Sequence, residues 1–214
     1  MPSIPVGDIT MYYEIHGAGE ELLLIPGLAT DVTDYARIIP LLASSYRVIA
    51  VDNRGAGRTD KPDAPYTIEQ MAADAAGLLA ALQIDRAHVL GFSMGGRIAV
   101  ALALTHPELV RSLILVSTWV RRPTRRTLST RLVDLALRVP FLHGSRAHPQ
   151  PIYAGLRQRD ASRAYDASER LGEIHAPTLI LHGTGDRMAP LRYAEEMHAG
   201  IAGSQLITFP GGHI

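Results

Sequence analysis

Ser93 is the residue whose surroundings most clearly suggest chemistry. It lies in Gly91-Phe92-Ser93-Met94-Gly95-Gly96, between the apolar run 87–90 and the helix-forming residues 97–104. This pattern predicts a strand, a sharp turn and a helix, and the three glycines suit the close backbone approach at the turn. A serine on such a turn aims its hydroxyl away from the sheet. The amide of Met94 then points to where a negative oxygen would develop, so the motif predicts a nucleophilic serine.

Two further residues supply the partners that a serine nucleophile needs. Asp186 follows the apolar run 178–182, and His213 follows the run 204–209. A histidine would act as the base for Ser93, and a buried carboxylate would fix the tautomer of that histidine. Taken singly, each fits a turn aspartate or an exposed histidine equally well. Their chain order, with each residue directly after a predicted strand, favours a catalytic triad.

Apolar runs alternate with helical patterns along most of the chain. Strands are expected at 21–25, 47–51, 87–90, 113–116, 178–182 and 204–209. Helices are expected around 35–42 and 192–201, and at 68–82 with Thr67 as N-cap. Residues 8–16 are predicted to form a hairpin with 21–25. The alternation predicts an α/β fold, a mostly parallel sheet with helices on both faces and catalytic groups at the carboxyl ends of its strands.

The composition excludes several classes of function. The chain has 214 residues, a formal net charge of zero and no cysteine. Zero net charge argues against a nucleic-acid partner for the whole chain. Without cysteine there is no disulfide, thiolate nucleophile or cysteine metal site, and the histidines lack metal-binding spacing, so no metal or other cofactor is expected. No membrane-spanning run and no signal-peptide pattern are found, so we expect a cytoplasmic protein that does not bind membranes.

The motifs together resemble those of a known family. The resemblance rests on residues 52–59, 91–96, 176–183 with Asp186, and 211–213. These segments are similar to those of α/β-hydrolases, in particular the branch of small esterases, lactonases and haloperoxidase-like enzymes. The resemblance spans nearly the whole chain and is more specific for fold than for chemistry, because one fold hosts many reactions.

The resemblance implies roles for individual residues. Ser93 would be the nucleophile, His213 the base and Asp186 the acid. The backbone amide of Leu28 would be the second oxyanion donor beside that of Met94. Relatives usually carry His-Gly where this chain has Pro26-Gly27. Proline has no amide hydrogen, but the required donor comes two residues later in the chain.

The middle of the chain breaks the alternation. We predict a helical cap insertion at 119–172, with an α/β-hydrolase core formed by 1–118 and 173–214. The insertion holds eleven arginines and four acidic residues. This excess of positive charge indicates either a cationic lid that attracts carboxylate substrates or a solvated helix face. The spacing favours the solvated face, because four apolar residues recur at helical intervals: Leu128, Leu132, Leu135 and Val139. This apolar stripe would roof the pocket and leave the arginines in solvent. Neutralising Arg131 and Arg138 should then change kcat/KM by less than about threefold.

The reaction expected from these features is hydrolysis of a small carboxylic ester or lactone through an acyl-enzyme on Ser93. Thioester hydrolysis, carbon–carbon bond hydrolysis and perhydrolysis are alternatives on the same triad, and a weakly catalytic ligand receptor is an alternative of another class. Family members continue past the histidine into a helix that packs on the sheet, whereas this sequence ends at Ile214. We therefore expect that helix to be absent and apolar surface near Leu206 and Phe209 to favour a homodimer.

Overall fold

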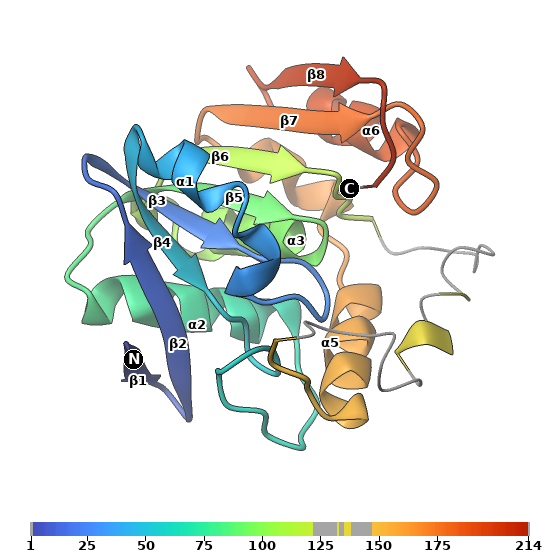
Figure 1. Cartoon of the computed structure of the whole chain (residues 1–214). Helices are drawn as coiled ribbons and strands as arrows, with labels where there is room; N and C mark the ends of the chain where they lie inside the picture. Colours follow the sequence, from blue (N-terminus) through green and yellow to red (C-terminus); the bar gives the residue numbers. More distant parts are fainter. Residues whose placement is uncertain (1, 122–131, 133–134, 138–146, 214) are drawn as a thin grey trace.

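The computed structural model describes residues 2–121, 132, 135–137 and 147–213. They form an eight-stranded sheet in the order β1-β2-β4-β3-β5-β6-β7-β8 (Figure 1). The strands are β1 Ser3–Val6, β2 Ile9–His16, β3 Glu20–Ile25, β4 Tyr46–Val51, β5 Ala87–Phe92, β6 Val110–Val116, β7 Thr178–Gly183 and β8 Gln205–Phe209. From β4 to β8 along this order the neighbours are parallel, and β1 and β2 are antiparallel additions. The predicted α/β fold with a mostly parallel sheet is confirmed.

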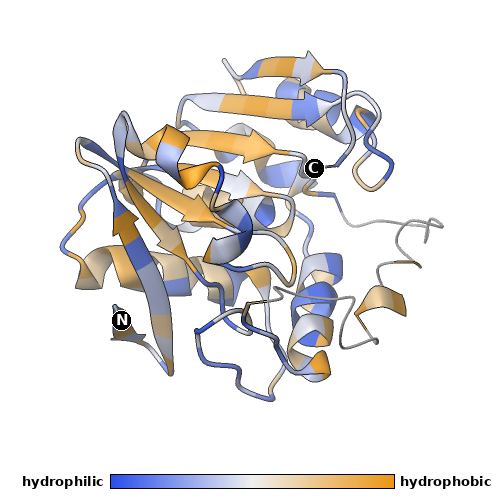
Figure 2. Cartoon of the chain, in the orientation of Figure 1, coloured by the Kyte–Doolittle hydropathy of each residue, from blue (hydrophilic) through white to orange (hydrophobic). Residues whose placement is uncertain are grey.

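The central strands are buried on both faces. Leu23 and Ile25 of β3 belong to the larger core cluster, whereas Leu22 and Leu24 pack into a second cluster on the other face. Alternation with a period of two sends successive side chains to opposite faces of a sheet. A strand that is apolar at every position is therefore stable only between two neighbours and beneath two layers of helices. Figure 2 shows this concentration of hydrophobic residues in the middle of the sheet.

Helices cover both faces of the sheet. They are η1 Val32–Tyr35, α1 Ile39–Ala43, α2 Ile68–Ala81, α3 Met94–Thr105, η2 Pro107–Leu109, α5 Ile152–Ala164, η3 Ser168–Glu173 and α6 Arg192–Gly200. The elements α2, α3 and α6 bury their apolar residues in the larger cluster, and η1 and α1 bury theirs in the second. In the described parts of the chain, no helix is both long and apolar enough to cross a membrane.

Local signals placed α2 correctly. Thr67 is its N-cap, and the hydroxyl of Thr67 accepts a hydrogen bond from the amide of Gln70 at 3.0 Å. The helix expected around 35–42 is instead two short pieces, η1 and α1. Pro40 explains the break, because proline has no amide hydrogen for an intrahelical bond and is tolerated only in the first turn of a helix.

The predicted hairpin is wrong. β2 pairs with β1 and β4, and β3 pairs with β4 and β5. In β2, Glu14 and His16 remain partly exposed, whereas β3 is buried from Leu22 to Ile25. The strand with four consecutive apolar residues, Leu22 to Ile25, takes the interior position between two parallel neighbours, and the half-polar strand moves outward. The need to bury both faces of β3 therefore decides which strands pair, and it outweighs the closeness of β2 and β3 in the sequence.

Between β6 and β7 the structure describes α5 and η3, and α5 lies beside the carboxyl-terminal ends of the central strands (Figure 1). The expected roof of leucines is not confirmed, because Leu132 and Leu135 are 58% and 59% exposed. Leu128, Val139, Arg131 and Arg138 lie outside the described residues. The division into a core and a cap at 119–172 stays a prediction.

The last strand, β8, pairs with β7 and exposes Ile207 and Phe209 on its outer face. Leu206 points the other way and packs against the larger core cluster. The expected exposed apolar surface thus includes Phe209 but not Leu206. Homodimer formation stays a prediction.

Candidate active site

Ser93 sits on a strained turn between β5 and α3. Its backbone has φ +50° and ψ −113°, a combination that costs about 1–3 kcal/mol for a residue other than glycine. Neighbouring groups hold it there. The Ser93 amide donates to the carbonyl of Val116 at 2.9 Å, and the hydroxyl of Thr118 donates to the Ser93 carbonyl at 2.6 Å. Both partners lie at the end of β6, so the adjacent strand maintains the strain.

The glycines of the motif are required by close backbone contacts. A Cβ on Gly95 would overlap the carbonyl oxygen of Ile25, and a Cβ on Gly91 would overlap the carbonyl of Gly95. A Cβ on Gly96 would lie 2.6 Å from Cβ of Thr118. The start of α3 therefore approaches β3 and β6 as closely as the sequence pattern implied.

The imidazole of His213 joins Ser93 to Asp186. Its Nε2 lies 2.9 Å from Ser93 Oγ, and its Nδ1 lies 2.8 Å from Asp186 Oδ2. The amides of Met188 and Ala189 each donate to Asp186 Oδ1 at 2.8 Å. Burial alone would raise the pKa of Asp186, but the hydrogen bonds from His213 and these amides outweigh it and hold the pKa below its ordinary value.

An ionised Asp186 accepts a hydrogen bond from Nδ1 of His213, and this leaves Nε2 of the neutral ring free to accept the Ser93 proton. The loop after β7 that carries Asp186 is fixed by a second histidine. His182 is fully buried, and its Nε2 donates to the carbonyl of Ala189 at 2.6 Å. Sequence analysis grouped His182 with the scattered histidines, because its role depends on a carbonyl seven residues later.

Two residues with unoccupied backbone amides line the same cavity as Ser93. Leu28, Met94 and Ser93 line one small cavity of about 70 Å³, together with Trp119, Arg159, Ser162, Arg163 and Met188. Neither the Leu28 amide nor the Met94 amide donates a hydrogen bond to another described residue. Two free amides beside a serine hydroxyl form the arrangement that stabilises an oxyanion.

The loop that carries Leu28 is fixed on both sides. The Gly27 amide donates to the hydroxyl of Tyr35 at 3.0 Å, and the Ala29 amide donates to Oε1 of Gln158 at 2.9 Å. Sequence analysis missed both partners. Tyr35 and Gln158 carry no motif, and Gln158 lies 129 residues from Ala29.

Trp119 connects the triad to a buried cation. Its ring centroid lies 6.4 Å from that of His213, and the guanidinium of Arg97 lies 4.2 Å from the ring on the α3 side. Arg97 Nε donates to the carbonyl of Trp119 at 2.9 Å. Arg97 is fully buried, and burial lowers its pKa to about 9. Sequence analysis did not single out Arg97 or Trp119.

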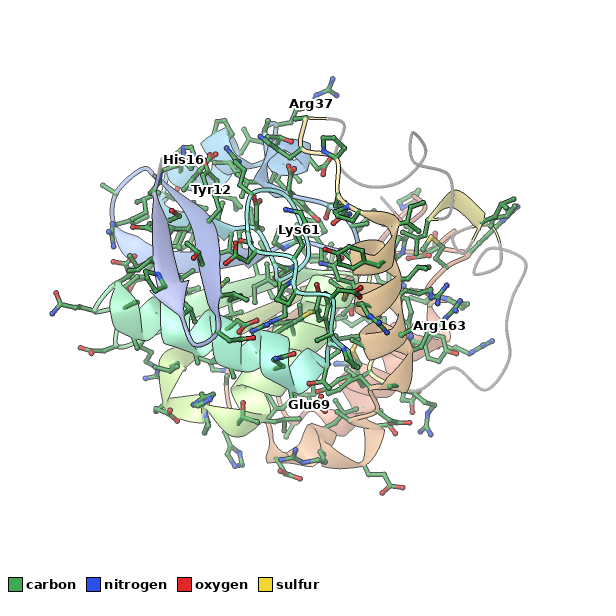
Figure 3. The ribbon with its side chains drawn as sticks, turned by 90° about the horizontal axis from the view of Figure 1, so that it is seen from below. Tyr12, His16, Arg37, Lys61, Glu69 and Arg163 are labelled. Atoms are coloured by element: carbon green, nitrogen blue, oxygen red, sulfur yellow. The ribbon has the colours of Figure 1, made fainter. Side chains whose placement is uncertain are left out.

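The arginines of the segment between β6 and β7 are not all on a solvated face. Arg159 and Arg163, both on α5, are partly buried and line the cavity at Ser93. Figure 3 labels Arg163 on this helix and Lys61 on the loop packed beside it. Arg157 pairs with exposed Asp63 at 3.3 Å, and Arg159 pairs with exposed Asp160 at 2.7 Å. The solvated face expected around Arg131 and Arg138 lies outside the described residues and stays a prediction.

Within the described ranges, no group of three or more histidine, aspartate or glutamate side chains is placed to hold a metal ion. His148, which the spacing analysis left unassigned, instead lies 3.1 Å from the buried carboxylate of Asp31.

Comparison with known proteins places this geometry in a family. Residues 21–143 match the family described as alpha/beta hydrolase fold. The chain belongs to the α/β-hydrolase family. It is 32% identical over 235 residues to a protein of Azorhizobium caulinodans named "Putative carbamate hydrolase RutD", covering 96% of this chain and 88% of that protein. It is 31% identical over 225 residues to the 2-hydroxymuconate semialdehyde hydrolase of Pseudomonas sp. strain CF600, covering 90% and 80%.

A solved structure agrees with this α/β-hydrolase assignment. The enol-lactonase of Burkholderia xenovorans LB400 superposes with a TM-score of 0.84 at 28% identity, covering 99% of this chain and 92% of that one. The expected family and fold are confirmed, and the chain is a hydrolase. The named relatives differ in the bond that they cleave, so membership alone does not define the substrate.

Proposed function

We propose that this α/β-hydrolase cleaves a small carboxylic ester or lactone through an acyl-enzyme on Ser93, with Asp186 and His213 completing the triad. The observation that carries the proposal is the continuous chain of hydrogen bonds from Asp186 through His213 to Ser93. This chain ends at a cavity lined by Leu28 and Met94, whose backbone amides have no described acceptor. The substrate is a small molecule, and no metal or other cofactor takes part.

In the acylation step, Ser93 Oγ attacks the substrate carbonyl while His213 Nε2 accepts the hydroxyl proton. The carbonyl oxygen becomes an oxyanion, and the amides of Leu28 and Met94 donate hydrogen bonds to it. Ionised Asp186 stabilises the imidazolium of His213. The imidazolium then returns the proton to the departing alkoxide, so that an alcohol leaves and an acyl-enzyme remains.

In the deacylation step, a water molecule occupies the site from which the alcohol has departed. His213 Nε2 removes a proton from this water, and the resulting nucleophile attacks the acyl carbonyl. The same two amides stabilise the second oxyanion. Its collapse releases the carboxylic acid, and Ser93 regains its proton from His213. With a lactone, alcohol and acid are parts of one product.

Similar proteins support both this proposal and its main alternative. The enol-lactonase supports lactone hydrolysis, and the name 2-hydroxymuconate semialdehyde hydrolase supports carbon–carbon bond cleavage. A carbamate, as in the name of the Azorhizobium relative, also presents a carbonyl to the serine. Ester and lactone cleavage requires only the groups described above, whereas carbon–carbon cleavage also requires protonation of a carbon leaving group.

The cavity lining favours one class of ester. Arg159 and Arg163 line the cavity and none of the described lining residues is acidic, although Arg159 also pairs with Asp160 at 2.7 Å outside the lining. A carboxylate on the substrate would meet a complementary potential there. The second candidate is therefore an ester or lactone that carries a carboxylate.

The test is a panel of activated esters of graded acyl length, matched carboxylate-bearing esters, lactones, thioesters and a vinylogous diketone for carbon–carbon cleavage. Ester or lactone turnover that is lost in Ser93→Ala supports the proposal. Turnover confined to the diketone would replace it with carbon–carbon hydrolysis. Ligand binding without turnover of any substrate would favour the receptor alternative.

A further inference from the structure

Gln158 of α5 is buried between two loops of the sheet, the loop that follows β3 and the loop that follows β4. Its side chain is fully inaccessible to solvent. Its Oε1 accepts from the amide of Ala29 at 2.9 Å, and its Nε2 donates to the carbonyl of Arg54 at 2.7 Å. One side chain thus bridges the loop after β3 and the loop after β4.

The two partners fix the orientation of this amide. A backbone amide can only donate and a backbone carbonyl can only accept, so Oε1 must face Ala29 and Nε2 must face Arg54. A rotated side chain would place oxygen against oxygen and hydrogen against hydrogen. Gln158 is therefore matched to these two groups, and a residue lacking either an acceptor or a donor leaves a buried backbone group unsatisfied.

The residue that Gln158 holds is itself in an unfavourable conformation. Ala29 has φ +58°, in the left-handed region that non-glycine residues rarely occupy. Such conformations persist only where surrounding contacts over-determine them. At Ala29 these contacts include the hydrogen bond to Gln158, and the next residue towards the N-terminus is Leu28.

The direction of the Leu28 amide follows from the groups around it. The hydroxyl of Thr30 donates to the carbonyl of Gly27 at 3.1 Å. Because a trans peptide places its carbonyl and its amide hydrogen on opposite sides, this bond turns the Leu28 amide the other way. The Gly27 amide is occupied by Tyr35 and the Ala29 amide by Gln158. The amides of Leu28 and Thr30 have no described acceptor, and of these two residues Leu28 is the one that lines the cavity at Ser93.

We infer that Gln158 is a positioning residue for the oxyanion-stabilising loop. By holding Ala29, it aims the amide of Leu28 at the substrate oxyanion. The segment between β6 and β7 thereby completes the catalytic machinery in addition to bordering the cavity. This inference rests on the proposed function, because it assigns the Leu28 amide to an oxyanion.

The test compares Gln158→Met with the matched control Gln150→Met. Gln150 is also a buried glutamine of this segment, but its side-chain oxygen and nitrogen make no hydrogen bond with described residues. With p-nitrophenyl acetate, Gln158→Met should lower kcat about 10- to 100-fold, as expected for a misaligned oxyanion donor. KM should change by less than about threefold, and Gln150→Met should leave kcat within about twofold.

Gln158→Glu separates the two hydrogen bonds. It keeps an oxygen opposite Ala29 but places its second carboxylate oxygen against the carbonyl of Arg54, so its kcat should fall below that of the wild type. Equal losses in the methionine variants at 158 and 150, or wild-type kcat in folded Gln158→Met, would overturn the inference. Full turnover in Ser93→Ala would instead show that the proposed function is wrong.

A measurement on the unaltered protein covers the case in which the Gln158 variants do not fold. Amide hydrogen exchange is recorded with and without methylboronic acid, which forms a tetrahedral adduct on a nucleophilic serine. The Ala29 amide should be protected in both states, and the Leu28 amide only in the adduct. An Ala29 amide that exchanges as fast as an open loop, or a Leu28 amide unaffected by the adduct, would contradict the inference.

Discussion

Asp186 Oδ2 accepts a hydrogen bond from Nδ1 of His213 at 2.8 Å, while Asp186 Oδ1 is occupied by two backbone amides. The carboxylate therefore has one oxygen for the loop and one for the imidazole. The two different partners therefore predict how an asparagine at position 186 would orient its side-chain oxygen and nitrogen.

Asp186→Asn should keep the fold and lose most of the activity. The amide oxygen of asparagine would accept from Met188 and Ala189, so its NH₂ group would face Nδ1 of His213. Nδ1 would then become the acceptor, and the proton would move to Nε2, which could no longer accept from Ser93. A loss of about 10³- to 10⁴-fold in kcat is expected, with an unchanged circular dichroism spectrum. A loss below about tenfold would show that Asp186 does not set the tautomer.

The same carboxylate predicts how stability depends on pH. The pKa of Asp186 lies below its ordinary value of 3.8 in the folded chain. Its contribution to stability is therefore present above the unfolded pKa and is lost as the pH falls through the folded pKa. The difference in thermal midpoint between the wild type and Asp186→Asn should be present at pH 5 and should shrink below about pH 4. A difference that grows between pH 5 and pH 3 would contradict the sign of this shift.

Some of this site could be predicted from sequence because the relevant signals are local. The turn at Ser93 requires glycines within three residues, and Asp186 and His213 each directly follow an apolar strand. Parallel strands bring their carboxyl ends to one edge, so local patterns sufficed to bring distant residues together. The cap of α2 by Thr67 was predictable for the same reason.

Other features depend on partners that no local pattern specifies. β2 pairs with β4 and not with β3, because competition for interior positions decides the strand order. Gln158 and Arg97 act through buried backbone carbonyls and amides far along the chain. Polar residues of this kind look like surface residues in the sequence until the packing that encloses them is known.

Arg163→Gln tests whether the cavity selects charge. If Arg163 attracts a substrate carboxylate, kcat/KM for a carboxylate-bearing ester should fall about five- to tenfold, and that for its neutral counterpart should change less than twofold. Arg157→Gln, on the same helix but paired with exposed Asp63, is the control and should change neither value. Added salt should weaken the preference of the wild type. Equal effects of both variants on both esters would favour an apolar substrate.

Tyr35→Phe tests the second support of the oxyanion-stabilising loop. The substitution leaves the buried Gly27 amide without its acceptor, at a cost of about 1–3 kcal/mol in stability. We expect kcat to fall about 5- to 20-fold, and the double variant with Gln158→Met to lose less than the product of the single losses. Tyr46→Phe, at the amino-terminal end of β4, is the control for removing a tyrosine hydroxyl. Fully multiplicative losses would show that the two supports act independently.

The central claim is that Ser93 is the nucleophile of this hydrolase, and covalent labelling tests it most directly. The protein is incubated with a fluorophosphonate, digested and analysed by mass spectrometry, in parallel with Ser93→Ala. The account predicts a single phosphonyl adduct on Ser93, with turnover lost in step with labelling. It also predicts no adduct in Ser93→Ala, whose kcat should be lower by at least about 10⁴-fold. An unlabelled Ser93, together with wild-type turnover in Ser93→Ala, would contradict it.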